Sequence, residues 1–121
     1  MADQPLPTLQ QEKEVTVVTF GSELESIDES LLPGLGNYLA EQSRIVQPAA
    51  MIFDMTKVQF FSSSFIELLF RVSNKLASRG GKFAICGLTP HCAEVLHVTN
   101  LDRLWKIYPN RQAALEGLAS P

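Results

Sequence analysis

The sequence predicts a single-domain α/β fold in which helices pack on a mostly parallel β-sheet. Two observations lead to this prediction. Short β-branched or apolar runs alternate with segments of helical periodicity, in the order strand, strand, then helix and strand in turn, with a helix at the end. The chain has 121 residues, of which 45% are apolar, which is enough for one compact core. Parallel strands joined by right-handed helical crossovers satisfy this order.

The first third of the chain supplies an opening hairpin and a helix. Residues 1–7 contain two prolines and no apolar periodicity, which predicts a flexible N-terminal arm. The runs 8–12 and 15–20, the second rich in β-branched residues, predict a β-hairpin. A helix is expected over about 30–42, where Pro33 is tolerated because the first turn needs no amide donor from it.

The central strand and the best-defined helix follow. The apolar run 49–55 has the length of a strand and predicts one that is covered on both faces. Apolar residues then recur at steps of three and four, which indicates an amphipathic helix that Gly80 and Gly81 end. Ser64 and Glu67 match the S-x-x-E capping box at its start. The recurring apolar residues are Phe65, Leu68, Leu69, Val72 and Leu76.

The last third of the chain continues the alternation. Residues 82–87 predict a strand, and residues 90–99 a short helix. Residues 104–108 predict a last strand and residues 111–118 a last helix. Residues 119–121 remain as a C-terminal tail.

Composition argues against several classes of function. The formal net charge is -3 and the basic residues form no stripe, so a nucleic-acid partner is not expected. No apolar run reaches the ~18 residues of a membrane span, and the first ten residues lack the features of a signal peptide, so direct membrane insertion is not expected. The two thiols fit neither CxxC nor a disulfide framework, which favours a reducing, cytoplasmic location.

No catalytic, metal or cofactor site is expected, so the chain is interpreted as a binding protein and not as an enzyme. The serine run lacks the flanking glycines of a nucleophile elbow. Phe83 stands where a phosphate loop needs Ser or Thr. The two cysteines and two histidines lack the CxxC or HxxxH spacing of zinc sites. The candidate metal ligands rejected on this ground are Cys86, His91, Cys92 and His97.

A family resemblance lies in FDMTKVQFFSSSFIELL, residues 53–69. A strand ending in Asp, a short linker, two aromatic residues, a serine run and an amphipathic helix resemble the central signature of STAS domains. The stretches 18–26, 82–96 and 97–115 resemble further parts of that family in the same order. The resemblance covers roughly residues 8–118 and implies a STAS-like domain of the bacterial anti-sigma-factor-antagonist type.

The resemblance also implies a regulatory serine. The family motif usually reads aspartate, serine, serine or threonine, glycine, and a partner kinase phosphorylates the serine after the aspartate. The motif falls on residues 62–65, so Ser63 is the candidate phosphorylation site, while Ser62 replaces the acid and Phe65 the glycine. The family's other acidic position, near the first helix, falls on Glu25. The switch surface around Ser63 is then expected to comprise Ser62, Ser64, Phe65, Glu25 and Asp54.

Two alternatives stay open at this motif. Serine caps helices well, so capping alone also explains the serine run. Phe65 is in phase with the core face of the helix, which favours burial. An exposed aromatic beside Ser63 would instead make a good interface anchor.

A serine at a helix start suits a release switch. A phosphate is tolerated there, because unpaired amides point outward and the helix dipole favours negative charge. It adds a charge of about -1.5 to -2, most of which remains available to repel a partner. The first hypothesis is a protein-binding module that sequesters an anti-sigma factor or serine kinase, an ATP-using partner, until Ser63 is phosphorylated.

The alternative hypothesis needs no phosphorylation. A STAS adaptor or scaffold subunit would bind other STAS-type subunits in a stress-sensing or transporter-associated complex. Ser62 and Phe65, which depart from the family motif, favour this alternative.

Overall fold

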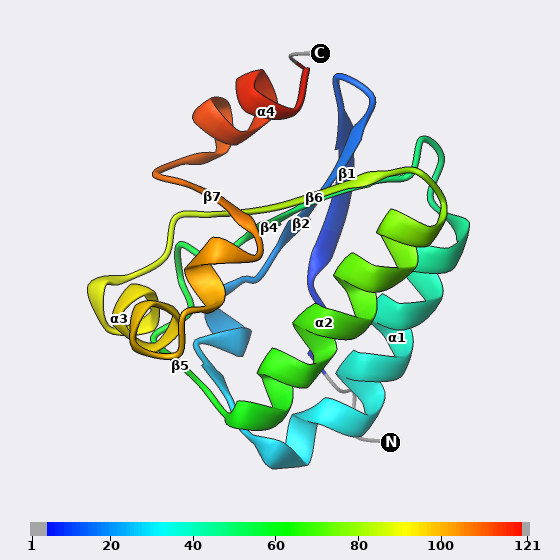
Figure 1. Ribbon diagram of the computed structural model, residues 1–121. Helices are drawn as coiled ribbons and strands as arrows, with labels where there is room; N and C mark the ends of the chain where they lie inside the picture. The colour runs from blue at the N-terminus through cyan, green and yellow to red at the C-terminus, as the bar shows by residue number, and fades with distance from the viewer. Residues whose placement is uncertain (1–4, 120–121) are drawn as a thin grey trace.

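The computed structural model describes residues 5–119, and Figure 1 shows how their helices and strands are arranged. Residues 1–4 of the predicted arm and residues 120 and 121 of the predicted tail lie outside the described residues. Pro7, the last residue of the predicted arm, is buried.

Five strands form the main sheet, which confirms the predicted α/β class. The opening hairpin pairs β1 (Thr8–Glu12) with β2 (Val15–Thr19) in the antiparallel direction. All later neighbours in this sheet are parallel, as predicted. The strand order is β1-β2-β4-β6-β7, where β4 is Ala50–Asp54, β6 is Lys82–Cys86 and β7 is Lys106–Tyr108.

Alternation along the strands separates two apolar layers. Val18 and Phe53 belong to one layer, and their neighbours Val17 and Ile52 to the other. The first layer is covered by α1 (Leu32–Ile45) and α2 (Ser63–Ser78), which lie side by side (Figure 1). The second layer is covered by α4 (Arg111–Ala119). The helix predicted over about 30–42 is α1, which begins and ends two to three residues later than expected.

A second, smaller sheet is absent from the sequence-based prediction. It consists of β3 (Ser26–Ile27) and β5 (Phe60–Phe61), which are parallel. Strands of two residues are too short to show an alternating pattern. The helix α3 (Pro90–Val98) contacts β5. Because β5 leads directly into α2, the small sheet fixes where that helix begins. The chain also forms 3-10 turns at Ser22–Leu24, Glu29–Leu31 and Leu101–Arg103.

The C-terminal end of α2 confirms the predicted glycine stop. Gly80 has a left-handed φ of 73°, and its N–H donates to the Ala77 carbonyl at 3.0 Å. The N–H of Gly81 donates to the Leu76 carbonyl at 2.8 Å. This pair of bonds is the Schellman arrangement that ends helices at glycine.

The predicted capping box at the start of α2 is wrong. The helix begins at Ser63, and its N-cap is Ser62. The Ser64 hydroxyl donates to Glu29 of the 3-10 turn before α1. A tertiary contact has therefore replaced the local capping bond.

Candidate functional site

The small sheet positions the start of α2. The N–H of Ser62 donates to the Ile27 carbonyl at 3.0 Å, and the N–H of Phe60 donates to the Glu25 carbonyl at 3.2 Å. These bonds hold the β3 segment against the chain that enters α2. Glu25 and Ser63 are both exposed in this region. The structure thus brings two of the residues assigned to the switch surface to one end of the molecule.

Ser63 occupies the first position of α2 and is exposed. The first amides of a helix have no partner within the helix, so N–H groups point outward beside this residue. The Phe65 N–H is turned back to the Ser62 carbonyl, at 3.0 Å. A group added to the Ser63 hydroxyl would enter solvent and not the core.

Ser64 connects α2 to the segment before α1. Its hydroxyl lies 2.7 and 2.9 Å from the two carboxylate oxygens of Glu29, 35 residues away in the sequence. This contact holds a carboxylate beside the residue that follows Ser63. Nothing in the local sequence pattern signals such a distant partner.

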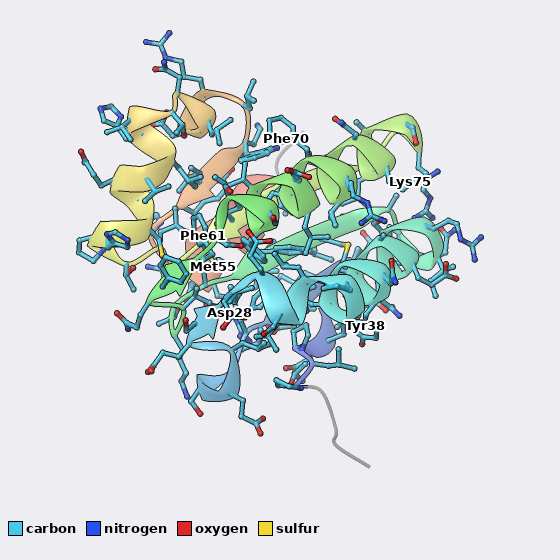
Figure 2. The ribbon with its side chains drawn as sticks, turned by 90° about the horizontal axis from the view of Figure 1, so that it is seen from below. Asp28, Tyr38, Met55, Phe61, Phe70 and Lys75 are labelled. Carbon is cyan, nitrogen blue, oxygen red and sulfur yellow. The ribbon has the colours of Figure 1, made fainter. Side chains whose placement is uncertain are left out.

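Further carboxylates surround the start of α2. The pKa of Asp28 is lowered because the Ser30 hydroxyl and N–H both donate to it, so the group is ionised at neutral pH. Figure 2 shows Asp28 and Phe61 at this end of the molecule, with Lys75 toward the other end of α2. Several carboxylates therefore gather at this end, where Arg71 lines the same hollow as Glu29 and Glu67. The exposed carboxylates of this end belong to Glu23, Glu25, Asp28, Glu29 and Glu67.

Ser62 caps α2 through its backbone and not through its side chain. Its backbone is extended, with φ of -81° and ψ of 168°, as N-cap residues usually are. Within residues 5–119, the Ser62 Oγ is buried and has no hydrogen-bond partner. Thr89, the N-cap of α3, differs, because its hydroxyl accepts from the Cys92 N–H at 3.3 Å.

We expect Ser62→Ala to leave the free energy of unfolding within about 0.5 kcal/mol of the wild-type value, or to raise it, because no hydrogen bond is lost. Thr89→Ala is the matched control and is expected to cost about 1 kcal/mol, as N-cap substitutions usually do. Urea unfolding followed by circular dichroism measures both. A cost for Ser62→Ala as large as that for Thr89→Ala would contradict the assignment.

Phe65 does not belong to the switch surface. It is fully buried, and its ring lies 5.9 Å from the Phe20 ring and 5.3 Å from the Phe61 ring, centroid to centroid. The interpretation of Phe65 as a core residue is confirmed, and its inclusion among the surface residues is wrong. The helical phase places its side chain on the face that packs on the sheet.

Asp54 is also not part of the switch surface. Its side chain points to the α4 layer, because Phe53 next to it fills the α2 layer. The carboxylate accepts two hydrogen bonds from the Arg111 guanidinium, at 3.0 and 3.2 Å, and two from Thr56. Burial by itself raises the Asp54 pKa, but the bonds from Thr56 and Arg111 outweigh it and lower the pKa. Asp54 therefore holds α4 on the sheet.

Phe60 is the exposed aromatic of this region. Its side chain is 44% exposed, whereas its neighbour Phe61 is buried. Adjacent residues of a strand point to opposite faces, so where only one face of a strand is covered, one of two consecutive aromatics points outward. The two consecutive aromatics could have indicated an exposed side chain, but only if the two-residue strand β5 had been predicted.

The two cysteines are buried packing residues. Burial raises the pKa of the Cys86 thiol to about 12, and burial also raises the pKa of the Cys92 thiol. Both thiols are therefore protonated and inert at neutral pH.

Among residues 5–119, no group of three or more His, Cys, Asp or Glu side chains is arranged to hold a metal ion. In the same part of the chain, no helix is long and apolar enough to cross a membrane.

Comparisons with known proteins place this geometry in context. A family model described as STAS domain matches residues 7–114. The chain is 33% identical to a solved anti-sigma-factor antagonist (STAS) domain protein from Planctomyces limnophilus. That alignment covers 96% of this chain and all of the other, with a TM-score of 0.90. None of the curated proteins compared with the chain matches it.

Two more distant structures share the fold. An anti-sigma factor antagonist from Mycobacterium paratuberculosis is 24% identical, with 94% of this chain and 93% of that chain covered and a TM-score of 0.80. The Bacillus cell fate determinant SpoIIAA in its phosphorylated form is 18% identical, with 91% and 96% covered and a TM-score of 0.65.

Proposed function

Because this chain belongs to the STAS domain family, we propose that it is a cytoplasmic protein-binding regulator that sequesters an anti-sigma factor or serine kinase and releases it when Ser63 is phosphorylated. Similarity over nearly the whole chain to an anti-sigma-factor antagonist domain supports the general kind of function. The observation that carries the switch is the exposed position of Ser63 in the first turn of α2. The protein acts by binding and not by catalysis.

Phosphorylation acts through charge placed next to existing charge. A phosphate on Ser63 would be carried by the residue next to Ser64, whose hydroxyl holds the Glu29 carboxylate at 2.7 Å. A phosphate next to acidic groups disrupts its surroundings by like-charge repulsion. The contact between Ser64 and Glu29 would weaken, and the turn before α1 would be held less firmly against α2.

The unphosphorylated surface offers an apolar anchor. Phe60 is 44% exposed on β5, close to where the chain enters α2. A partner that covers Phe60 would lie close to the start of α2, where a phosphate would lose bound water when the partner binds. Desolvation of a charged phosphate in an apolar contact is strongly unfavourable. Both effects favour release.

The test compares Ser63→Asp with Ser63→Asn, which has the same shape without the charge. Each protein is immobilised and exposed to extract of the native cells, and the captured proteins are identified by mass spectrometry. The affinity of the kinase or anti-sigma factor so identified is then measured by calorimetry. We expect Ser63→Asp to bind at least about tenfold more weakly than Ser63→Asn. Equal affinities for the two variants would contradict the switch.

Two further variants locate the binding surface. Phe60→Ser is expected to weaken binding of the same partner by about tenfold or more, as loss of an aromatic anchor does. Ile45→Ser is the control, because Ile45 is 46% exposed at the C-terminal end of α1. If Ile45→Ser weakens binding as much as Phe60→Ser, the partner does not bind at the start of α2.

The second candidate function is a STAS adaptor or scaffold subunit that is never phosphorylated. It is favoured by Ser62 in place of the family's acid and by the buried Phe65 in place of its glycine. Intact-mass spectrometry of the protein from native cells distinguishes the two functions. A phosphate located on Ser63 supports the switch, whereas an unmodified mass under growth and stress conditions supports the adaptor.

A further inference from the structure

A groove of about 530 Å³ lies at the other end of α2 from Ser63. The second half of α2, the first residues of β6 and β7, and the end of α4 enclose it. Its volume falls within the range of about 300 to 1,000 Å³ that is usual for small-molecule sites. The side chains that decide its chemistry are Phe70, Phe83, Leu104, Trp105, Lys82 and Lys106.

Ring contacts and one hydrogen bond hold the aromatic wall of the groove in place. The Trp105 ring lies 5.1 Å from the Phe70 ring and 6.3 Å from the Phe83 ring, each in an edge-to-face arrangement. The indole N–H donates to the Ser73 hydroxyl at 3.0 Å, which fixes the rotation of the ring. Figure 2 shows Phe70 on the side of α2 turned away from Tyr38 of α1. The wall is therefore formed before any ligand arrives.

The charge of the groove is positive, although the whole chain has a net charge of -3. Lys82 and Lys106 line the groove, and among residues 5–119 no acidic side chain does. The Lys82 ammonium donates to the Leu118 carbonyl at 2.8 Å, and Lys106 is exposed. An ammonium has three donors, so Lys82 retains donors for a second acceptor.

We propose that this groove binds a small amphipathic carboxylate of the fatty-acid class. The aromatic wall would cover the alkyl chain, and Lys106 with Lys82 would receive the carboxylate. The complementary charge argues against a cationic amphiphile, and the apolar wall argues against a fully polar anion. This site is separate from the start of α2 and does not depend on the function proposed for Ser63.

The only tryptophan of the chain, Trp105, reports binding directly. Decanoate, kept below its critical micelle concentration, is titrated into the full chain while tryptophan emission is recorded. We expect a saturable change in emission. Decanol and decyltrimethylammonium have the same alkyl chain and are expected to bind at least about tenfold more weakly. ¹⁵N NMR shifts of Asn74, Gly81 and Gly117, which also line the groove, provide a second measurement.

Variants identify the site. Lys106→Gln is expected to weaken decanoate binding by about fivefold or more, and Lys75→Gln, which removes an exposed charge outside the groove, is expected to leave it unchanged. Ala77→Leu puts a larger side chain into the groove and is expected to abolish binding. The proposal is overturned if neither emission nor NMR shifts saturate. Equal binding of the three probes, or equal effects of the two lysine variants, overturns it as well.

Discussion

Replacing Phe65 with glycine is expected to lower the free energy of unfolding by about 4 to 6 kcal/mol, although glycine is the residue that the family motif has at this position. Phe65 is fully buried and packs edge-to-face on Phe20. Truncating a buried Phe to Ala costs about 3 to 5 kcal/mol, and glycine within a helix costs about 1 kcal/mol more. Urea unfolding of the purified variant measures the loss.

Glu67→Gly is the control for this prediction, because Glu67 is exposed in the same turn of α2. It is expected to lower the free energy of unfolding by about 1 kcal/mol or less, because only the poor helix propensity of glycine contributes. If Phe65→Gly costs no more than Glu67→Gly, the assignment of Phe65 to the core is wrong. The expected difference has a consequence for the family motif. Here the start of α2 is anchored by an aromatic side chain in the core, so the glycine cannot be restored without loss of stability.

The main sheet and its helices could be predicted because each of these elements has a repeating pattern of its own. The apolar steps from Phe65 to Leu76 are long enough to define a helix, and Gly80 defines its end. The run 49–55 defines a strand by its length and apolarity. Local pattern and tertiary burial agree at these positions, which is why the fold class is confirmed.

The details of the candidate site depend on contacts that no local pattern contains. Ser64 bonds Glu29 across 35 residues, and Arg111 bonds Asp54 across 57 residues. The local sequence favoured a capping box for Ser64. In the structure its hydroxyl instead donates to the Glu29 carboxylate, in the turn before α1. The assignment of Asp54 to the switch surface fails for a related reason. Successive residues of a strand point to opposite faces of the sheet, so the Asp54 carboxylate lies on the face away from α2.

Arg111→Met is expected to lower the free energy of unfolding at pH 7 by about 2 kcal/mol. The Arg111 guanidinium bonds Asp54, Thr19 and Glu12, and so holds the start of α4 on three strands. Removing one partner of a fully buried ion pair costs about 3 to 5 kcal/mol, because the other charge stays buried. The Arg111 side chain is 32% exposed and that of Asp54 11%, so water reduces this cost.

The pH dependence of this loss follows from the lowered pKa of Asp54. Its folded-state pKa lies below the unfolded value of about 3.9, so the carboxylate contributes its full stabilisation above that value. The contribution is lost as the pH falls through the folded-state pKa. The difference in stability between wild type and Arg111→Met should therefore be constant from neutral pH to about pH 5 and shrink in stronger acid.

Arg44→Met supplies the control for the ion pair. Arg44 pairs with Glu41 within α1, and both side chains are more than half exposed. Water and salt screen an exposed pair of this kind, so Arg44→Met should scarcely change stability at any pH. If both variants cost the same, or if the cost of Arg111→Met stays constant into acid, Asp54 does not hold α4 through its charge. The expected outcome would establish that Asp54 stabilises the fold through its charge, by holding Arg111 and with it the start of α4.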